Sequence, residues 1–203
     1  VRSTYEAAVE AIQRVDPRTP CIVGAAPFYD RTRLQDALLP KSNVIYAYNF
    51  FVPRRWTNGE LRDAAYPGSV PCCELHDKAH ARCCPKVSAR AGTDLGKMPC
   101  CRVSVPVNSA TLEEQLLEPL RFGAAHQVPV FMDQWGVQRD MHGRVSYLQD
   151  MLALLQKHRV SWTYWQWRHK SDRPFAVVHL NEHEAHPIAH LDDVGAFAAV
   201  LAR

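Results

Sequence analysis

Aromatic and amide side chains gather at the ends of the four segments that the sequence predicts as strands. These positions are Ala26-Pro27-Phe28, Tyr48-Asn49-Phe50-Phe51, Asp133-Gln134-Trp135 and Trp165-Gln166-Trp167. Sugars present apolar C–H faces and many hydroxyl groups, so a carbohydrate cleft needs aromatic platforms beside amides and carboxylates. The pattern fits such a cleft, but strands of any function are rich in aromatic residues, and composition alone favours this structural explanation. Trp56, which follows Arg54 and Arg55, is either an outer sugar-stacking residue or a solvent-facing one.

Strands and helices alternate along the chain and would carry these residues on parallel strands. Apolar runs predict strands at 21–26, 43–53, 128–136 and 161–167, and periodic segments predict helices at 1–16, 31–39, 111–127, 144–158 and 191–202. Thr111 is the expected N-cap of its helix, with Glu114 three residues on in capping-box spacing. The strands are apolar on both faces, which indicates parallel βα units and an α/β fold.

Two α/β architectures fit this alternation. A doubly wound open sheet and a (β/α)8 barrel both show it, but a barrel needs eight strands and roughly 250 residues. The chain has 203 residues and four predicted strands, so we expect half of a barrel or a small open sheet. No glycine-rich phosphate loop follows any strand to favour a nucleotide-binding sheet.

Composition argues against two classes of partner. The net charge of +3 is small and the 24 basic residues are scattered, so we expect no nucleic acid. No apolar run approaches the roughly 20 residues that span a bilayer, and residues 1–16 read as an amphipathic helix, so we expect no membrane partner. A targeting sequence would lie upstream of Val1, and the compartment is not predicted from this end.

The segments NVIYAYNFFVP, VPVFMDQWGVQRD and SWTYWQWR, in this order, resemble the second half of the catalytic domain of glycoside hydrolase family 5, the cellulase-like (β/α)8 barrels. The resemblance covers nearly the whole chain except a cysteine-rich segment at about 70–105. It implies that residues 1–203 supply about the last four βα units of a barrel, with that segment as an insertion. It also implies a retaining glycosidase that uses two glutamates to hydrolyse β-linked polysaccharide.

Matching the family's motifs to this sequence assigns roles to single residues. Trp165 matches the tryptophan that stacks under the sugar at the cleavage point. Asn49 and Phe51 stand where the family has His and Tyr, and both lack the family's group that hydrogen-bonds the nucleophile or the sugar. Asn49 is still expected to hydrogen-bond near the cleavage point, and Phe51, Trp135 and Trp56 are further candidates for substrate binding.

Gln134 stands where the family places its nucleophile, a glutamate. A carboxamide is uncharged and a far weaker nucleophile, so Gln134 would not form the glycosyl-enzyme of a retaining mechanism. Asp133 is the alternative carboxylate, but neighbouring strand residues point to opposite faces, so it would need a β-bulge or register shift. The acid/base glutamate would precede Val1. This chain alone is therefore expected to be inactive, and a non-catalytic carbohydrate-binding pseudoenzyme is the alternative function.

Six of the seven cysteines form three vicinal pairs, Cys72-Cys73, Cys83-Cys84 and Cys100-Cys101. A disulfide-stapled loop or an unstructured insertion explains them better than zinc, because Cys73, His76, His80 and Cys83 spread too far along a helix for one ion. Cys21 is expected to be a buried apolar residue of its strand. The histidines His179, His183, His186 and His190 lack metal-motif order and are expected in a solvated loop. We expect no metal and no cofactor, and a secreted location if the cysteines form disulfides.

Two partners are expected. One is an oligo- or polysaccharide. The other is the missing N-terminal half-barrel, because half a barrel leaves the outer edges of its first and last strands unpaired.

Overall fold

The computed structural model describes residues 2–75 and 103–166, with the short segments 168–169, 175–176, 178–179 and 188–189. Several predictions lie outside these residues: those on the cysteine pairs at 83–84 and 100–101, on the histidines discussed above other than His179, and on the closing helix. The chain divides into two compact units. The first comprises residues 1–50, 114–135 and 158–164, and the second comprises residues 51–113, 136–157 and 165–203.

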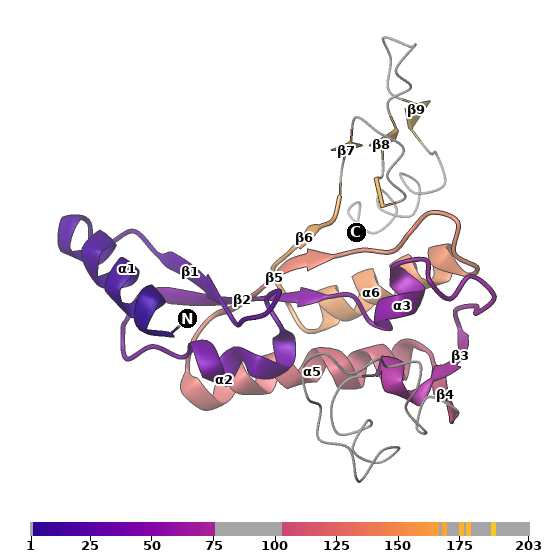
Figure 1. The fold of residues 1–203 in the computed structure, drawn as a ribbon, viewed down its shortest axis with the longest axis horizontal. Helices are drawn as coiled ribbons and strands as arrows, with labels where there is room; N and C mark the ends of the chain where they lie inside the picture. Colours follow the sequence, from indigo (N-terminus) through magenta and orange to yellow (C-terminus); the bar gives the residue numbers. More distant parts are fainter. Residues whose placement is uncertain are drawn as a thin grey trace. The chain divides into compact units, whose positions relative to one another are not determined.

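The first unit is built on a four-stranded parallel sheet (Figure 1). Its strands are β1 (Cys21–Gly24), β2 (Val44–Phe50), β5 (Val130–Trp135) and β6 (Trp162–Tyr164), in the order β1-β2-β5-β6. Every neighbouring pair is parallel. Each strand lies within its predicted range, which confirms the prediction of an α/β fold with parallel strands.

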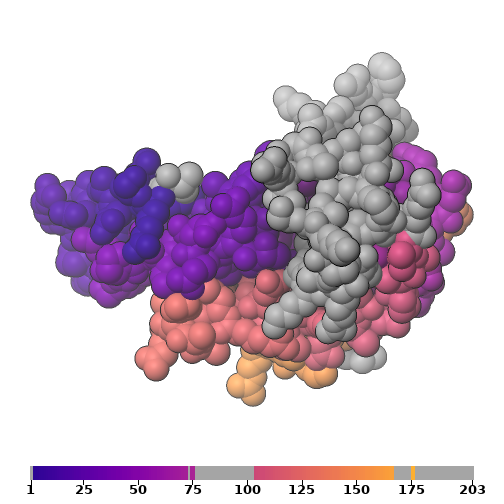
Figure 2. Space-filling view, turned by 60° about the horizontal axis from the view of Figure 1, so that its bottom comes forward, coloured from indigo at the N-terminus to yellow at the C-terminus, as the bar shows by residue number. Residues whose placement is uncertain are grey.

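Helices flank this sheet in sequence. They are α1 (Arg2–Val15), the 3-10 turn η1 (Arg31–Arg33) with α2 (Leu34–Ala37), and α5 (Ser109–His126), whose residues from Glu114 onward belong to this unit. The helix predicted at 31–39 is shorter because Leu38 is already extended, two residues before Pro40. In the space-filling view α1 forms the indigo end of the unit (Figure 2).

The two faces of this sheet are distinguished by contacts with α5. The Tyr46 ring packs edge-on against Phe122 of α5, with 5.5 Å between centroids. Side chains alternate along a strand, so Tyr46, Tyr48 and Phe50 face α5, and all three are fully buried. Ala47 and Asn49 lie on the opposite side, which we call the inner face.

The second unit contains several short elements and the helix α6 (Arg144–Lys157). Its elements are α3 (Arg54–Thr57), β3 (Gly68–Pro71), the 3-10 turn η2 (Cys72–Glu74), β4 (Ser104–Val107), α6 (Arg144–Lys157), β7 (Arg168–His169), β8 (Val178–His179) and β9 (Ile188–Ala189). Helix α6 buries seven residues, Arg144, Tyr147, Leu148, Met151, Leu152, Leu154 and Leu155. Among the described residues, no helix is both long and apolar enough to cross a membrane.

Strands β3 and β4 form an antiparallel ribbon that brackets the cysteine-rich segment. The ladder runs from Gly68 opposite Val107 to Pro71 opposite Ser104. It is extended by a hydrogen bond of 2.7 Å from the amide of Cys72 to the carbonyl of Val103. The chain therefore leaves and re-enters this unit at neighbouring positions.

The N-terminus of α5 corrects one sequence prediction. The helix begins at Ser109, and the side chain of Asn108 accepts a hydrogen bond of 3.1 Å from the amide of Thr111. Asn108 is therefore the N-cap, and Thr111 is the third helical residue rather than the cap. Asparagine is also a favoured N-cap residue, and the helix extends back to it.

Candidate functional site

Strand β5 is bulged at Asp133. On the β2 side, Tyr48 pairs with Met132 and Asn49 pairs with Gln134, so the ladder skips Asp133. A bulge re-aims the side chains beside it, and here it places Gln134 in register with Asn49 on the inner face. Without the bulge, strict alternation from Met132 would also put Gln134 on the side that faces α5.

Strand β6 accommodates the same bulge. The β5–β6 register shifts over the same residues of β5. A bulge leaves a backbone group without its ladder partner, and the hydroxyl of Thr163 donates a hydrogen bond to the carbonyl of Asp133. A side chain of the neighbouring strand thus fixes the bulge in place.

Asp133 shares the inner face with Gln134. Phe131 lies opposite Ala47 and therefore points to the inner side. The pleat returns Asp133 to that side two residues later, and the bulge then adds Gln134 to it. Both side chains are half-buried. The expectation that these neighbours point to opposite faces is corrected, because the bulge interrupts the alternation on which it rested.

Tyr29 lies over the inner face near Asp133. Gly24 is opposite Ala47 in the β1–β2 ladder, so a Cβ on Gly24 would point to the inner face, where it would overlap the Tyr29 ring. Burial raises the pKa of the Tyr29 hydroxyl, and the Tyr5 hydroxyl and the Asp133 carboxylate raise it further. This electrostatic effect places the Asp133 carboxylate in the neighbourhood of Tyr29, in agreement with the register.

Asn49 holds the loop that follows β1. Its side-chain Nδ2 donates a hydrogen bond of 3.0 Å to the carbonyl of Phe28, and its backbone amide donates one of 2.8 Å to the carbonyl of Tyr29. The Oδ1 atom of Asn49 is buried and has no hydrogen-bond partner within the described residues. A buried acceptor of this kind is rare, and it leaves a position for one further donor.

The loop presents an exposed aromatic ring at the C-terminal edge of β1. Phe28 and Tyr29 both have positive φ, 58° and 57°, a backbone conformation that residues other than glycine seldom adopt. Phe28 is 80% exposed. Strained residues cluster at binding sites, where the surrounding contacts hold them. Phe28 was predicted at a strand end but not as a site residue, and Tyr29 was not predicted at all; the aromatic pair after Pro27 was the available signal.

Trp135 is a core residue and not a sugar platform. It is fully buried, with its ring edge-on to Trp162 at 5.5 Å and to Tyr164 at 5.1 Å. Its register partner Phe50 faces α5, so the Trp135 ring lies on that side of the sheet. The prediction of substrate binding by Trp135 is wrong because the bulge turns this ring away from the inner face.

Trp56 is likewise buried, within the second unit. It is 1% exposed and packs against Tyr66 at 5.8 Å and Tyr147 at 5.2 Å between centroids. Its indole nitrogen donates a hydrogen bond of 3.0 Å to the carbonyl of Ala64. Both readings of Trp56, as a sugar-stacking or a solvent-facing residue, are therefore corrected.

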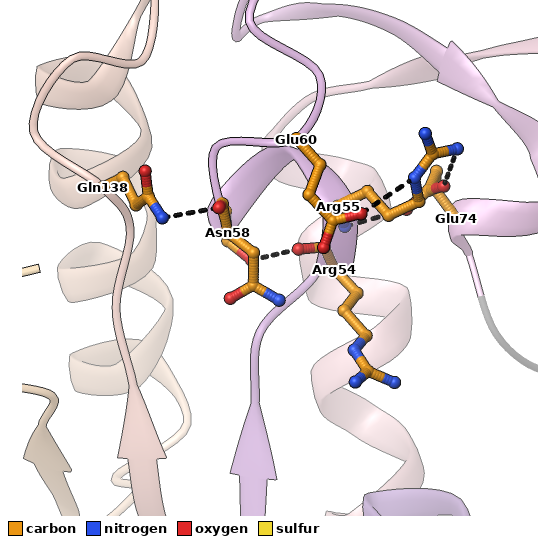
Figure 3. Close-up of polar contacts among 7 residues, drawn as sticks. Arg54, Arg55, Asn58, Glu60, Glu74 and Gln138 are labelled. Carbon is orange, nitrogen blue, oxygen red and sulfur yellow. Dashed lines mark hydrogen bonds and ion pairs between the residues drawn. The ribbon is translucent and has the colours of Figure 1, made fainter. Parts of the chain in front are cut away.

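Arg54 and Arg55 differ in their surroundings (Figure 3). The Arg55 side chain turns toward Glu60, at 3.2 Å, and Glu74, at 3.4 Å, whereas the Arg54 side chain points away from these carboxylates. Glu74 is buried and also accepts a hydrogen bond of 2.9 Å from the Arg55 amide. Burial raises the pKa of Glu74, and its contacts with Arg55 oppose the rise. Arg55 is thus a structural residue of this unit.

Among the described residues of the second unit, Trp165 has an exposed tryptophan ring and is 39% exposed. Gly136 lies against its backbone, since a Cβ on Gly136 would overlap the Trp165 carbonyl and touch Phe175. Phe51 packs edge-on against Phe175 at 5.9 Å. The Phe51 ring is half-buried and supports Phe175, while its role in substrate binding stays a prediction.

The structure gives the bonding state of two cysteines in the described parts of the chain. Cys72 is buried and disulfide-bonded, and Cys21 is a buried free cysteine, as expected for a strand residue. Within the described residues, no three His, Cys, Asp or Glu side chains come together as a metal site.

The inner face at the C-terminal edge of this sheet therefore combines three kinds of group: a phenol (Tyr29), two carboxamides (Asn49 and Gln134) and one carboxylate (Asp133). The loop that Asn49 holds adds the exposed ring of Phe28 beside them. The amides can donate to and accept from hydroxyl groups, and the carboxylate can accept a proton. Rings with amides and a carboxylate are suited to a polyhydroxylated ligand with apolar C–H faces.

Comparison with known proteins matches this chain to one family. The sequence profile of cellulase (glycosyl hydrolase family 5) matches residues 1–171. No curated protein sequence matches the chain.

Solved structures share the fold at low sequence identity. The endoglucanase Cel5A from the hyperthermophilic Thermotoga maritima is 16% identical with a TM-score of 0.62, covering 96% of this chain and 53% of that one. Cel5A of Thermotoga maritima in complex with mannotriose substrate is also 16% identical, with a TM-score of 0.61 over 96% of this chain and 53% of that one. The cellulose synthase subunit Z (CcsZ) from Clostridioides difficile is 15% identical, with a TM-score of 0.60 over 96% of this chain and 54% of that one. This chain spans about half the length of these structures. Of the two expected architectures, the comparisons confirm a partial (β/α)8 barrel rather than a small open sheet.

Proposed function

The chain belongs to glycosyl hydrolase family 5, and on this premise we propose that its inner face forms part of a cleft for β-linked oligo- or polysaccharide and takes part in the hydrolysis of O-glycosidic bonds. The observation that carries the proposal is the register partnership of Asn49 and Gln134 at the C-terminal edge of the sheet. In barrels of this kind the chemistry is found at that edge.

The groups around this pair support a sugar ligand. Phe28 presents an apolar ring to solvent, and Asn49 keeps a buried acceptor without a partner among the described residues. A sugar hydroxyl could satisfy that acceptor. In the second unit, the exposed ring of Trp165 is the residue that the family resemblance assigns to stacking. Its backbone is confined by Gly136, which limits how the turn that carries the ring can move.

Gln134 favours a second candidate function, binding without turnover. An amide in the nucleophile's position cannot form a glycosyl-enzyme, so covalent catalysis by the family's route is not available to this chain. A pseudoenzyme would retain saturable binding and release no reducing ends from a β-glucan.

Calorimetric titration of the full chain with cellotriose and with mannotriose tests the proposal. We expect saturable binding that weakens about fivefold or more in Phe28→Ala and in Trp165→Ala, since a stacked ring contributes on the order of 1 kcal/mol. Val145→Ala, another exposed apolar residue, should bind like the unaltered protein. Absence of binding to either trisaccharide, or equal affinity in all four proteins, would contradict the proposal.

A further inference from the structure

The bulge leaves the sheet with an acidic group beside the position where the family's nucleophile is missing. Asp133 and Gln134 are adjacent in sequence and share the inner face, which regular pleating would forbid. The side-chain bond from Thr163 to the Asp133 carbonyl holds this arrangement from the neighbouring strand. Bulges are found near active sites because they redirect side chains in this way.

The Asp133 carboxylate is not occupied by a structural role. Within the part of the chain that the structure describes, it forms no ion pair and accepts no hydrogen bond. Its effect on Tyr29 is repulsive rather than stabilising for the ionised phenol. By contrast, Glu118 accepts a hydrogen bond of 2.7 Å from Arg31, and Glu74 is bound by Arg55. The half-buried Asp133 carboxylate is thus available for a proton or a ligand.

We propose that Asp133 is a general base that accepts a proton from a water molecule held by the Gln134 amide, so that this site hydrolyses β-glycosides with inversion of configuration. The inference rests on the proposed function. An aspartate is one methylene shorter than a glutamate, and Asp133 is one residue set back from the nucleophile's position. Inverting sites need this extra room, because their carboxyl groups stand roughly 6.5–9.5 Å apart with a water between them.

The reaction balances with an activated substrate. In a β-glycosyl fluoride, the water oxygen bonds to the anomeric carbon as the carbon–fluorine bond breaks. Fluoride leaves with the electron pair. One proton of the water passes to Asp133 and then to solvent, and the other stays on the new hydroxyl group. No acid is needed for a leaving group of this kind. A polysaccharide would require, in addition, a carboxylic acid to protonate the leaving oxygen.

The full chain should be tested with β-cellobiosyl fluoride. We expect release of fluoride above the spontaneous rate, with the α-anomer of cellobiose as the first product in proton NMR before mutarotation. Asp133→Asn should lower the rate at least about 100-fold, the lower range for loss of a general base. Asp140→Asn is the matched control, because Asp140 is exposed and pairs only with exposed Arg62 in the described residues.

A second variant distinguishes loss of the base from misfolding. Asp133→Ala with added azide should form the α-glycosyl azide, because the small anion fits the space that the carboxylate leaves and needs no base. Equal fluoride release in Asp133→Asn and the unaltered protein, or β-cellobiose as the first product, would overturn the assignment. Trisaccharide binding without any fluoride release would defeat this inference and leave the proposed function standing, whereas absence of both would defeat the proposed function.

Discussion

Asn49 of β2 and Gln134 of β5 are register partners on the inner face, so two neutral carboxamides lie at the C-terminal edge of neighbouring parallel strands. The Asn49 side chain is partly committed, because its Nδ2 donates to the Phe28 carbonyl. Gln134 forms no side-chain hydrogen bond within the described residues. The pair therefore joins one amide that fixes a loop to one that is open to a ligand or water.

The two tryptophans of the second unit that were predicted to bind sugar, Trp56 and Trp165, should differ in how much they contribute to the stability of the fold. We expect Trp56→Ala to lower the free energy of unfolding by about 3–5 kcal/mol, because it empties a buried site and removes the bond to Ala64. Trp165→Ala should change it by less than about 1 kcal/mol, since this ring is partly exposed. Urea unfolding followed by circular dichroism measures both. Similar losses in the two variants would mean that Trp165 is also a core residue.

Arg31 should be more important for stability than its exposed neighbour Arg33. Arg31 is 5% exposed, and its guanidinium binds Glu118 at 2.7 Å and also contacts Gln115. Arg31→Ala would remove the donor shared by the buried Gln115 and the partly exposed Glu118, so we expect a loss of about 3 kcal/mol in the free energy of unfolding.

Arg33→Ala is the control for this pair. Arg33 reaches Asp36 at 2.7 Å, but both side chains are about half exposed. Exposed pairs contribute roughly 0–1 kcal/mol, so the midpoint in urea should barely move. A loss in Arg33→Ala as large as that in Arg31→Ala would contradict the buried network.

Glu74 should make stability fall as pH rises. Burial raises the pKa of Glu74 above its ordinary value of 4.5, so the folded protein holds this proton more tightly than the unfolded chain. The free energy of unfolding then decreases with pH, because the folded state binds more protons. The stabilising contribution is complete below pH 4.5 and is lost as the pH rises through the folded pKa.

Glu74→Gln removes this titration. We expect its Tm, relative to that of the unaltered protein, to be higher at pH 7 than at pH 4.5 in differential scanning calorimetry. Glu60→Gln is the matched control: Glu60 also pairs with Arg55 at 3.2 Å but is about half exposed, so its relative Tm should change less. A relative Tm of Glu74→Gln that falls with pH would show that the ion pair with Arg55 outweighs burial.

Gly136→Ala should impair sugar binding through Trp165. The added Cβ would overlap the Trp165 carbonyl, which is backbone and has little room to give, so the turn that carries the ring must shift. We expect the affinity for cellotriose to fall by a factor similar to that of Trp165→Ala. Gly123→Ala is the control, because its Cβ would press on Val128 and Val130 in the first unit instead. Unchanged affinity in Gly136→Ala would mean that Gly136 does not control the position of the Trp165 ring for sugar binding.

Much of the sheet was predictable because its strands are apolar on both faces. The runs CIVG and VIYAYNF read as buried parallel strands, and both are strands in the structure. The short connection between them was harder. RTRLQDALL has helical composition, but Asp30 caps a 3-10 turn through Thr32, and Leu38 is already extended ahead of Pro40, so only one α-helical turn forms.

The candidate site was predictable by residue type but not by direction. The sequence MDQW contains no mark of a bulge, which is visible only in the register of β5 against β2 and β6. One inserted residue reverses the alternation, so it brought Gln134 to the inner face and sent Trp135 to the core. Trp56 was misjudged for a related reason: its partners Tyr66 and Tyr147 are distant in sequence and become neighbours only after folding.

The β3–β4 ribbon makes the length of the cysteine-rich segment almost independent of the rest of the fold. Pro71 faces Ser104, and the Cys72 amide bonds to the Val103 carbonyl, so the chain leaves and re-enters the ribbon at neighbouring positions. Closing a longer loop adds only about 0.6 kcal/mol for each doubling of its length. A change in the number of residues beyond Leu75 should therefore cost the fold little, whereas Glu74, which is buried against Arg55, belongs to the unit that carries the segment.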